Sequence, residues 1–334
     1  MSGELTPLPL VSAASCSLQG RRSRQEDAAG YLVRDGWAFL IVADGMGGVG
    51  HGDFASQKAC DVFLRAAARF AEKGGRESQF LENTAFLVNG LLLGEKRNHR
   101  WADVGTTAAL VLYRQGKLTV AHAGDSRVYL VTRDDVQLLT RDHAPTHELL
   151  ERGLAHSLSQ ARQMVGTGVT CSLGDEGFSG MEVREVELPS PCLVILTTDG
   201  AHEFLEPADF LHQAAGSSSV ADLTRRLARL ALERGSQDNI TVVAGEIGEF
   251  PRGKVLAAPI TGLETQTWPS AVRQWPRWFG GLAAGFVLGW ALSCGVQHRL
   301  NFGTLGGQAS TPKTTTAPAV TPNQQPPGIP DESR

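Results

Sequence analysis

The stretch that decides the fold is Trp37-Ala38-Phe39-Leu40-Ile41-Val42-Ala43-Asp44-Gly45-Met46-Gly47-Gly48. A short apolar run that ends in a glycine-rich turn is typical of a buried strand. It places the carboxylate of Asp44 at the strand end, where neighbouring side chains cannot shield it. Three further short motifs place carboxylates in similar settings: Gln25-Glu26-Asp27, Thr198-Asp199-Gly200 and Asp238-Asn239-Ile240.

Carboxylates that converge from several strand ends can hold hard cations, because Mg²⁺ and Mn²⁺ prefer oxygen ligands and leave positions for water. Two such ions can share a water and lower its pKa. They can also stabilise the charge that develops when this water attacks phosphorus in line. The four motifs therefore suit the hydrolysis of a phosphate ester. Taken singly each motif is weak, because an Asp before a Gly is most often a turn residue.

Around these motifs, β-rich runs alternate with helical ones. Short runs rich in Val, Leu, Ile and Thr predict strands at 37–43, 106–113, 118–123, 128–132, 183–188, 192–198 and 240–247. Helical periodicity appears at 53–72, 79–97, 207–215 and 220–234. Two helices early and two late, with antiparallel strands between them, predict an α+β layered domain over residues 1–250.

Composition narrows the class of protein. A hydrophobic content of 42% is ample for a packed core, and a formal net charge of −4 gives no general attraction to nucleic acid. The 5 cysteines are scattered without the spacing of a zinc site or a disulfide framework, which favours a reducing compartment. No basic, apolar leader opens the chain, which argues against a secretory signal.

The C-terminal part has a different pattern. Residues 251–277 read as a linker, and residues 278–297 then lack any charged side chain. At ~1.5 Å per residue this run extends roughly 30 Å, enough to cross a bilayer once as a helix. Arg273 and Arg277 precede it, which favours a cytoplasmic N-terminal domain at the cell membrane. We expect residues 298–334, rich in Thr, Pro and Gln, to form a disordered tail outside.

Within the expected span, Gly281, Gly285 and Gly289 recur every four residues. This spacing lets two helices approach closely and would support a homodimer. Glycine is common in membrane helices, so a coincidence of spacing is the alternative.

The order of the motifs is more specific than any one of them. Between the acidic motifs lie Gly105-Thr106-Thr107, Ala123-Gly124-Asp125-Ser126-Arg127 and Leu139-Thr140-Arg141-Asp142-His143. From Arg22 onward the chain resembles the type-2C, metal-dependent Ser/Thr protein phosphatases (the PPM family), particularly their bacterial branch. The resemblance covers about residues 11–248. It implies a central pair of antiparallel sheets flanked by helices, with the metal ions at one end.

The resemblance also implies roles for the acidic residues. Asp44 would bridge two Mn²⁺ or Mg²⁺ ions, and the carbonyl of Gly45 would complete one of the two sites. Asp199 and Asp238 would ligate the metal on the other side.

Three further residues would assist. Glu26 and Asp27 would hold metal-bound waters, so that Asp27 belongs to the metal site and Glu26 to its surroundings. Arg22 would bind the phosphate oxygens, for which a planar guanidinium offers paired hydrogen bonds.

Asp125 has two interpretations. The family places an Asp here that helps to hold a third, weaker metal. The alternative is a strand-edge Asp that pairs with Arg127.

Some departures from the family pattern limit the transfer of roles. Glu203 stands where the family often has Asp, and a longer side chain could alter a third metal site. Residues 164–174 differ from the usual sequence near the flap beside the active site. Substrate choice is therefore the property that transfers least.

The resemblance implies an enzyme that removes phosphate from phosphoserine and phosphothreonine in proteins, without a covalent intermediate, in opposition to a Ser/Thr kinase at the membrane. A catalytically inactive scaffold that binds phosphoproteins is the alternative from another class. Asp44, Asp199, Asp238 and Arg22 are all present, which favours the enzyme. A phosphatase for a small-molecule phosphate keeps the chemistry and changes the substrate.

Overall fold

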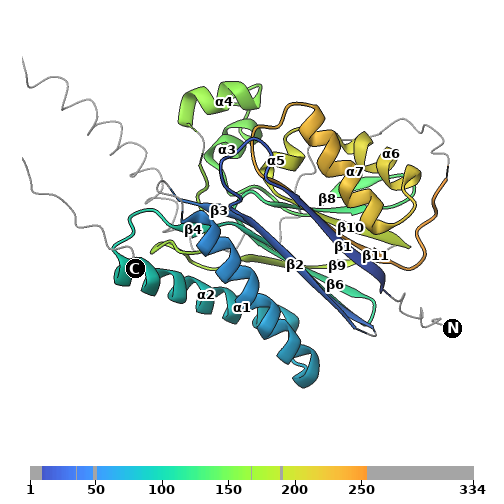
Figure 1. Cartoon of the computed structure of the whole chain (residues 1–334), viewed down its shortest axis with the longest axis horizontal. Helices are drawn as coiled ribbons and strands as arrows, with labels where there is room; N and C mark the ends of the chain where they lie inside the picture. Colours follow the sequence, from blue (N-terminus) through green and yellow to red (C-terminus); the bar gives the residue numbers. More distant parts are fainter. Residues whose placement is uncertain (1–9, 35, 48–50, 167, 189–190, 254–334) are drawn as a thin grey trace, which may run out of the picture. The chain divides into compact units, whose positions relative to one another are not determined.

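The computed structural model describes residues 10–34, 36–47, 51–166, 168–188 and 191–253 (Figure 1). The expected membrane span and tail, and nearly all of the expected linker, lie outside these ranges. Among the described residues, no helix combines the length and the apolar character needed to cross a membrane.

The first sheet contains both the first and the last strand of the domain. Its strands follow the order β1-β11-β10-β7-β8, and the pairs are antiparallel. Their bounds are β1 Leu10–Leu18, β7 Arg127–Val131, β8 Val136–Leu138, β10 Cys192–Thr197 and β11 Ile240–Ile247.

The second sheet follows the order β2-β3-β5-β6-β9, again antiparallel, and the short β4 pairs with the end of β3. Its strands are β2 Asp27–Arg34, β3 Trp37–Met46, β4 Gly105–Thr106, β5 Ala108–Arg114, β6 Lys117–Ala123 and β9 Glu182–Glu187. A two-residue turn joins β5 to β6, and Gln115 and Gly116 both have positive φ (50° and 86°). Such turns suit the twist of antiparallel strands.

Helices cover the outer faces of the two sheets (Figure 1). Helices α1 (Gly52–Lys73) and α2 (Glu77–His99) belong to the second sheet, and α6 (Pro207–Gly216) and α7 (Val220–Glu233) to the first. Three shorter helices are α3 (Pro145–Glu151), α4 (Leu158–Val165) and α5 (Asp199–His202). The sequence-based prediction of two antiparallel sheets flanked by helices is confirmed.

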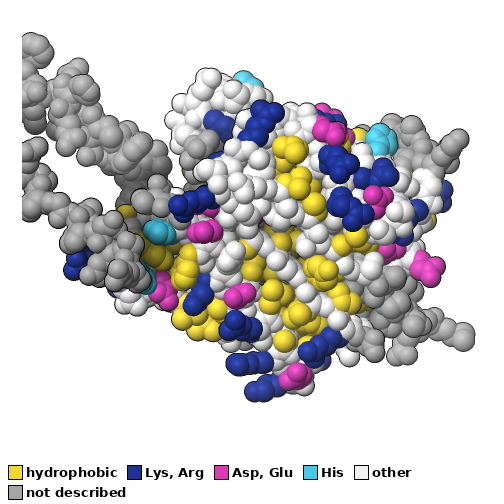
Figure 2. Space-filling model, in the orientation of Figure 1, with side chains coloured by type: hydrophobic (Ala, Val, Ile, Leu, Met, Phe, Trp, Pro, Cys, Tyr) yellow, Lys and Arg dark blue, Asp and Glu magenta, His cyan; other side chains and the backbone are white. Residues whose placement is uncertain are grey.

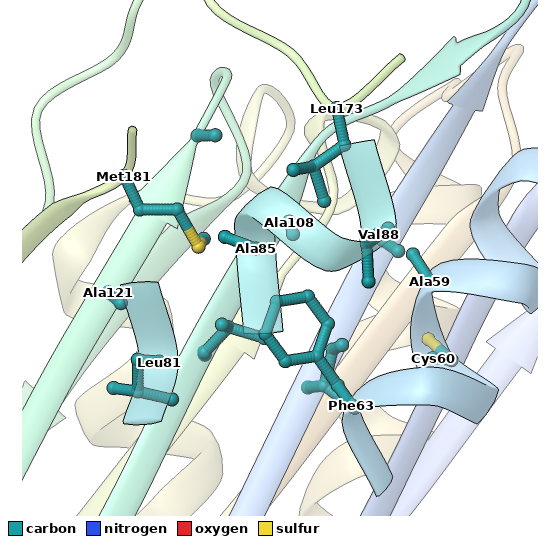
Figure 3. Close-up of a cluster of buried hydrophobic side chains, with 14 of the residues drawn as sticks. Ala59, Cys60, Phe63, Leu81, Ala85, Val88, Ala108, Ala121, Leu173 and Met181 are labelled. Atoms are coloured by element: carbon teal, nitrogen blue, oxygen red, sulfur yellow. The ribbon is translucent and has the colours of Figure 1, made fainter. Parts of the chain in front are cut away.

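Three buried hydrophobic clusters hold these layers together. One lies between the sheets, and one lies under each pair of helices. Figure 3 shows the cluster between α1, α2 and the second sheet, where Phe63 of α1 packs beside Leu81 and Ala85 of α2. Gly30 of β2 leaves room for this arrangement, because a Cβ there would lie 2.6 Å from a methyl carbon of Leu64.

The surface shows no single sign of charge on the face in Figure 2, where Lys and Arg side chains lie among Asp and Glu side chains. This distribution agrees with the modest net charge of −4. On this face, the described residues form no continuous basic track of the kind that a nucleic acid backbone needs.

Phe63 provides a test of the core. Phe63 is 0% exposed, whereas Phe86 on the neighbouring α2 is 50% exposed. We expect Phe63→Ala to lower the free energy of unfolding by about 3–5 kcal/mol, since it leaves a cavity between helix and sheet. Phe86→Ala serves as the matched control and should cost less than about 1 kcal/mol. Equal losses in urea denaturation of the two variants would contradict this account of the core.

Candidate metal centre and active site

Two of the predicted metal carboxylates lie side by side on the second sheet. Asp27 begins β2 and Asp44 lies near the end of β3, and the two residues are direct partners in the antiparallel register. The Oδ2 atom of Asp27 accepts a hydrogen bond of 2.9 Å from the hydroxyl of Thr198. Thr198 directly precedes Asp199, so this bond links the carboxylates of one sheet to those of the other.

The other two carboxylates lie where β10 ends and β11 begins. Asp199 is the first residue of α5, and Asp238 lies two residues before β11. Their two turns are pressed together, because a Cβ on Gly200 would lie 2.0 Å from the carbonyl oxygen of Asn239. The amide of Thr198 also donates to the carbonyl of Thr241 over 3.1 Å. The two acidic turns therefore form one rigid unit.

The electrostatics show that these carboxylates are costly to ionise on their own. Burial, followed by the charges of Asp27 and Asp199, raises the pKa of Asp44 well above its ordinary value. Burial and the neighbouring Asp199 and Asp238 raise the pKa of Asp27 to about 7, against hydrogen bonds that lower it. Burial and Asp238 likewise raise the pKa of Asp199. Bound cations would remove this cost, since an opposite charge favours the ionised form.

One oxygen of the cluster tests whether a cation fits. Among the described residues, Oδ1 of Asp199 is buried and accepts no hydrogen bond. A buried acceptor without a partner is rare and costs free energy, unless an ion or water satisfies it. The donor set of carboxylate oxygens matches the preference of Mg²⁺ and Mn²⁺. The residues therefore fit the divalent cations that the sequence predicts.

Gly45 is required by close packing of backbone on backbone. A Cβ at this position would lie 2.1 Å from the carbonyl oxygen of Gly52 and 2.6 Å from that of Glu26. The amide of Gly45 donates to that same carbonyl of Glu26 over 3.0 Å. The start of α1 is thus held against the turn that follows Asp44.

Arg22 lies beside the cluster, as the sequence predicts for a phosphate-binding residue. Its guanidinium donates to Oδ2 of Asp238 over 2.5 Å, and the Arg22 side chain is 54% exposed. A guanidinium has five N–H donors, so this bond leaves others free to meet an anion. The Arg22 guanidinium is therefore a solvent-accessible positive charge beside the carboxylate cluster.

Asp125 does not pair with Arg127, which corrects one of the two interpretations of this residue. Arg127 instead makes two hydrogen bonds to the carboxylate of Asp142, of 2.9 and 2.7 Å. The reason is orientation, since Arg127 begins β7 while Asp125 lies in the preceding turn. Burial and the charge of Asp199 raise the pKa of Asp125 to about 7, so it belongs electrostatically to the acidic cluster.

Asn239 is a positioning residue that sequence reasoning missed, although it lies within a quoted motif. Its Oδ1 accepts from the amide of Glu26, and its Nδ2 donates to the carbonyls of Gln19 and Arg24, each over 2.8 Å. One amide side chain thereby fixes the segment that carries Arg22, Glu26 and Asp27. The signal that could have found it is its chemistry, because a buried amide needs both donors and acceptors.

Thr106 and Thr107 hold the backbone of Asp44. The hydroxyl of Thr107 accepts from the Asp44 amide over 3.0 Å, and the hydroxyl of Thr106 donates to the Asp44 carbonyl over 2.8 Å. The Gly105-Thr106-Thr107 motif therefore acts on the metal site through the main chain.

A segment of two short helices, which the sequence pattern did not predict, lies between β8 and β9. We call α3, α4 and the residues up to Cys171 the flap segment. Arg162 of α4 forms an ion pair with Glu203, which directly follows α5. Leu154 and Met164 in this segment are 56% and 54% exposed. The flap segment thus connects through one charged contact to the helix that begins at Asp199.

With this geometry in view, comparisons with known proteins decide the family. Residues 17–240 match the family described as protein phosphatase 2C. The chain belongs to this family. The kind of enzyme predicted from the sequence, a metal-dependent phosphoprotein phosphatase, is thereby confirmed.

Curated relatives agree. The protein phosphatase PhpP of Streptococcus pneumoniae is 26% identical over 233 residues, which span 69% of this chain and 94% of PhpP. The serine/threonine protein phosphatase PstP of Mycobacterium tuberculosis is 28% identical over 256 residues, 73% of this chain and 47% of PstP.

Solved structures agree as well. The crystal structure of PstP from Mycobacterium tuberculosis has a TM-score of 0.63 at 26% identity and covers 72% of this chain and 100% of that one. The catalytic domain of PstP in complex with two manganese ions has a TM-score of 0.62 at 25% identity, over 72% of this chain and 100% of that one.

The repulsion among the carboxylates predicts a variant that is more stable without metal. We expect Asp199→Asn to raise the free energy of unfolding of the metal-free protein by about 1–2 kcal/mol, because it removes a buried charge of raised pKa. In chemical denaturation with chelator present, the exposed substitution Asp61→Asn should change stability by less than about 0.5 kcal/mol.

Two further readouts follow from the same cause. The metal-free wild type should lose stability as the pH rises from about 4 to about 7, because the folded state then holds more protons than the unfolded state. Mn²⁺ at 100 times its Kd should restore about 2.7 kcal/mol in the wild type and less in Asp199→Asn. A metal-free Asp199→Asn protein that is less stable than the wild type would refute the repulsion.

Proposed function

We propose that this chain hydrolyses phosphoserine and phosphothreonine in proteins by direct attack of water on phosphorus. The observation that carries the proposal is the convergence of Asp27, Asp44, Asp199 and Asp238 from both sheets on one coupled cluster. Two Mn²⁺ or Mg²⁺ ions held there, and a third that Asp125 would help to hold, would supply an activated water and neutralise charge at the phosphate.

The residues would divide the work as follows. Asp44 and the Gly45 carbonyl, with Asp199 and Asp238, would hold the two ions, and Asp27 and Glu26 would orient their waters. Because the hydroxyl of Thr198 donates to Asp27, that carboxylate is held in one orientation.

Arg22 would bind the phosphate. Its guanidinium is bonded to Asp238. An arriving phosphate would share the guanidinium's remaining donors, which keeps the anion within reach of the carboxylate cluster.

The cysteines support a mechanism without a covalent phosphoenzyme. Burial raises the pKa of the Cys60 thiol, and burial raises that of Cys192 to about 12. A thiol of raised pKa is a poor nucleophile at neutral pH. The scaffold alternative has less support, because all four acidic motifs and Arg22 are in place.

We further propose that the enzyme acts at the cytoplasmic face of the cell membrane, anchored by residues 278–297. The support is the charge-free run of twenty residues preceded by Arg273 and Arg277. Anchoring would concentrate the enzyme near a membrane-associated Ser/Thr kinase and its substrates. Self-association would use Gly281, Gly285 and Gly289.

The activity test uses the full chain in detergent and a phosphothreonine peptide. Phosphate release should require Mn²⁺ or Mg²⁺, stop with excess chelator, and fall at least a hundredfold in Asp44→Asn and Asp199→Asn. Arg22→Ala should raise KM more than it lowers kcat, with partial rescue by Arg22→Lys, since a lysine supplies the charge but not the paired donors. Asp61→Asn should behave as the wild type. A folded, metal-binding protein that releases no phosphate from any phosphopeptide would instead support the scaffold.

The location is tested separately. Deletion of residues 278–297 should move the protein from the membrane fraction to the supernatant without loss of peptide phosphatase activity. Wild-type protein that is released from membranes by high salt alone would contradict a spanning anchor.

A further inference from the structure

A second group of potential metal ligands lies apart from the carboxylate cluster. His122 lies near the end of β6, Glu182 is its direct partner at the start of β9, and His143 follows β8. One ligand atom from each of the three side chains lies within 4.8 Å of the others. The two imidazole rings stack with their centroids 4.4 Å apart.

A hydrogen bond to the main chain fixes the imidazole ring of His122, as is common for metal-binding histidines. Its Nε2 lies 2.6 Å from the carbonyl oxygen of Arg141. A carbonyl only accepts hydrogen bonds, so Nε2 carries the hydrogen and Nδ1 keeps its lone pair. Metal-binding histidines generally donate their second ring N–H to such a partner.

The other two side chains leave the group open to solvent. His122 is only 2% exposed, whereas the Glu182 side chain is 41% exposed and that of His143 is 20% exposed. The Nε2 of His143 lies 3.6 Å from Oε2 of Glu182. An ion can therefore enter from the side of Glu182 while the buried histidine closes the other side.

We propose that His122, His143 and Glu182 form a binding site for a transition-metal dication of the zinc class. Two imidazoles and a carboxylate make a donor set that Mg²⁺ does not favour and that zinc sites commonly use. Tetrahedral coordination at ~2.0–2.1 Å needs ligand atoms ~3.3 Å apart. The three ligand atoms lie within 4.8 Å of one another, and Nε2 of His143 is already 3.6 Å from Oε2 of Glu182, so binding needs only a small approach of the side chains. Glu182, whose side chain is 41% exposed, can move toward the two histidines.

The site would join the base of the flap segment to the sheet. The amide of His143 donates to the carbonyl of Gly124 over 3.0 Å, and its carbonyl accepts from the amide of Thr170 over 2.7 Å. His143 therefore connects the turn that carries Asp125 with the returning end of the flap segment. A metal ion that fixes His143 to β6 and β9 would also fix this connection.

The main chain also orients His143, because the amide of Gly124 donates to its Nδ1 over 3.3 Å and its Nε2 faces Glu182. Burial and the neighbouring His143 lower the pKa of His122 to about 4, so His122 is already neutral.

The test titrates Co²⁺, as a spectroscopic substitute for Zn²⁺, into the full chain with excess Mg²⁺ present to occupy the carboxylate cluster. We expect visible absorption bands of a low-coordinate Co²⁺ ion, which Zn²⁺ abolishes by displacement. Glu182→Gln should weaken binding at least tenfold, and His143→Gln should remove the bands. Glu187→Gln, on the same strand and exposed, is the matched control and should bind as the wild type does.

Two measurements distinguish loss of this site from misfolding and from metal binding at the carboxylate cluster. Glu182→Gln should keep the wild-type circular dichroism and the Mg²⁺-dependent release of phosphate. In the wild type, Zn²⁺ should slow hydrogen exchange of the Thr170 amide. Identical Co²⁺ spectra and affinities in the wild type, Glu182→Gln and His143→Gln would overturn the proposal, as would the absence of bands in the wild type.

Discussion

The mutual repulsion of a few buried carboxylates is the constraint on which the rest of this structure depends. Asp27 and Asp44 come from one sheet and Asp199 and Asp238 from the other, and the protein raises the pKa of the first three. Such a cluster opposes folding unless cations are present. The three buried hydrophobic clusters must therefore hold the two sheets together against the repulsion of the carboxylates at one end.

The structure meets this constraint through the main chain rather than through bulky side chains. Gly45 and Gly200 let backbone contact backbone where a methyl group would not fit. Hydrogen bonds from Asn239, Thr106 and Thr107 then satisfy amides and carbonyls around the acids, and the hydroxyl of Thr198 donates to the carboxylate of Asp27. Small residues and hydrogen bonds place the carboxylates accurately while leaving their oxygens available to ions.

The long elements could be predicted from the sequence because their apolar patterns are strong. The acidic residues could be predicted because they lie in short motifs that follow one another in a characteristic order. The strands at 37–43 and 240–247 are short, largely apolar runs, and the helices at 53–72 and 220–234 repeat their apolar residues. The observed β3, β11, α1 and α7 agree with these predictions to within a few residues. The strand β2 was not predicted, because Ala28, Ala29 and Gly30 are small and carry little strand signal. Gly30 is small because a Cβ there would meet Leu64 of α1. The helices α3, α4 and α5 are too short for a repeat to emerge. Long-range pairs such as Arg127 with Asp142, and the bonds of Asn239 to a segment more than 200 residues earlier, have no local signature at all.

The order of strands in the first sheet governs when the protein can become active during its synthesis. The last strand, β11, lies between the first strand, β1, and β10. A nascent chain that has emerged only as far as β10 has no partner for β1, and it lacks Asp238 as well. Until residues 240–247 have emerged from the ribosome, β1 and β10 each keep an unpaired edge. Catalytic competence therefore arises only after β11 has emerged, so a chain that stops before residue 240 cannot remove phosphate from proteins.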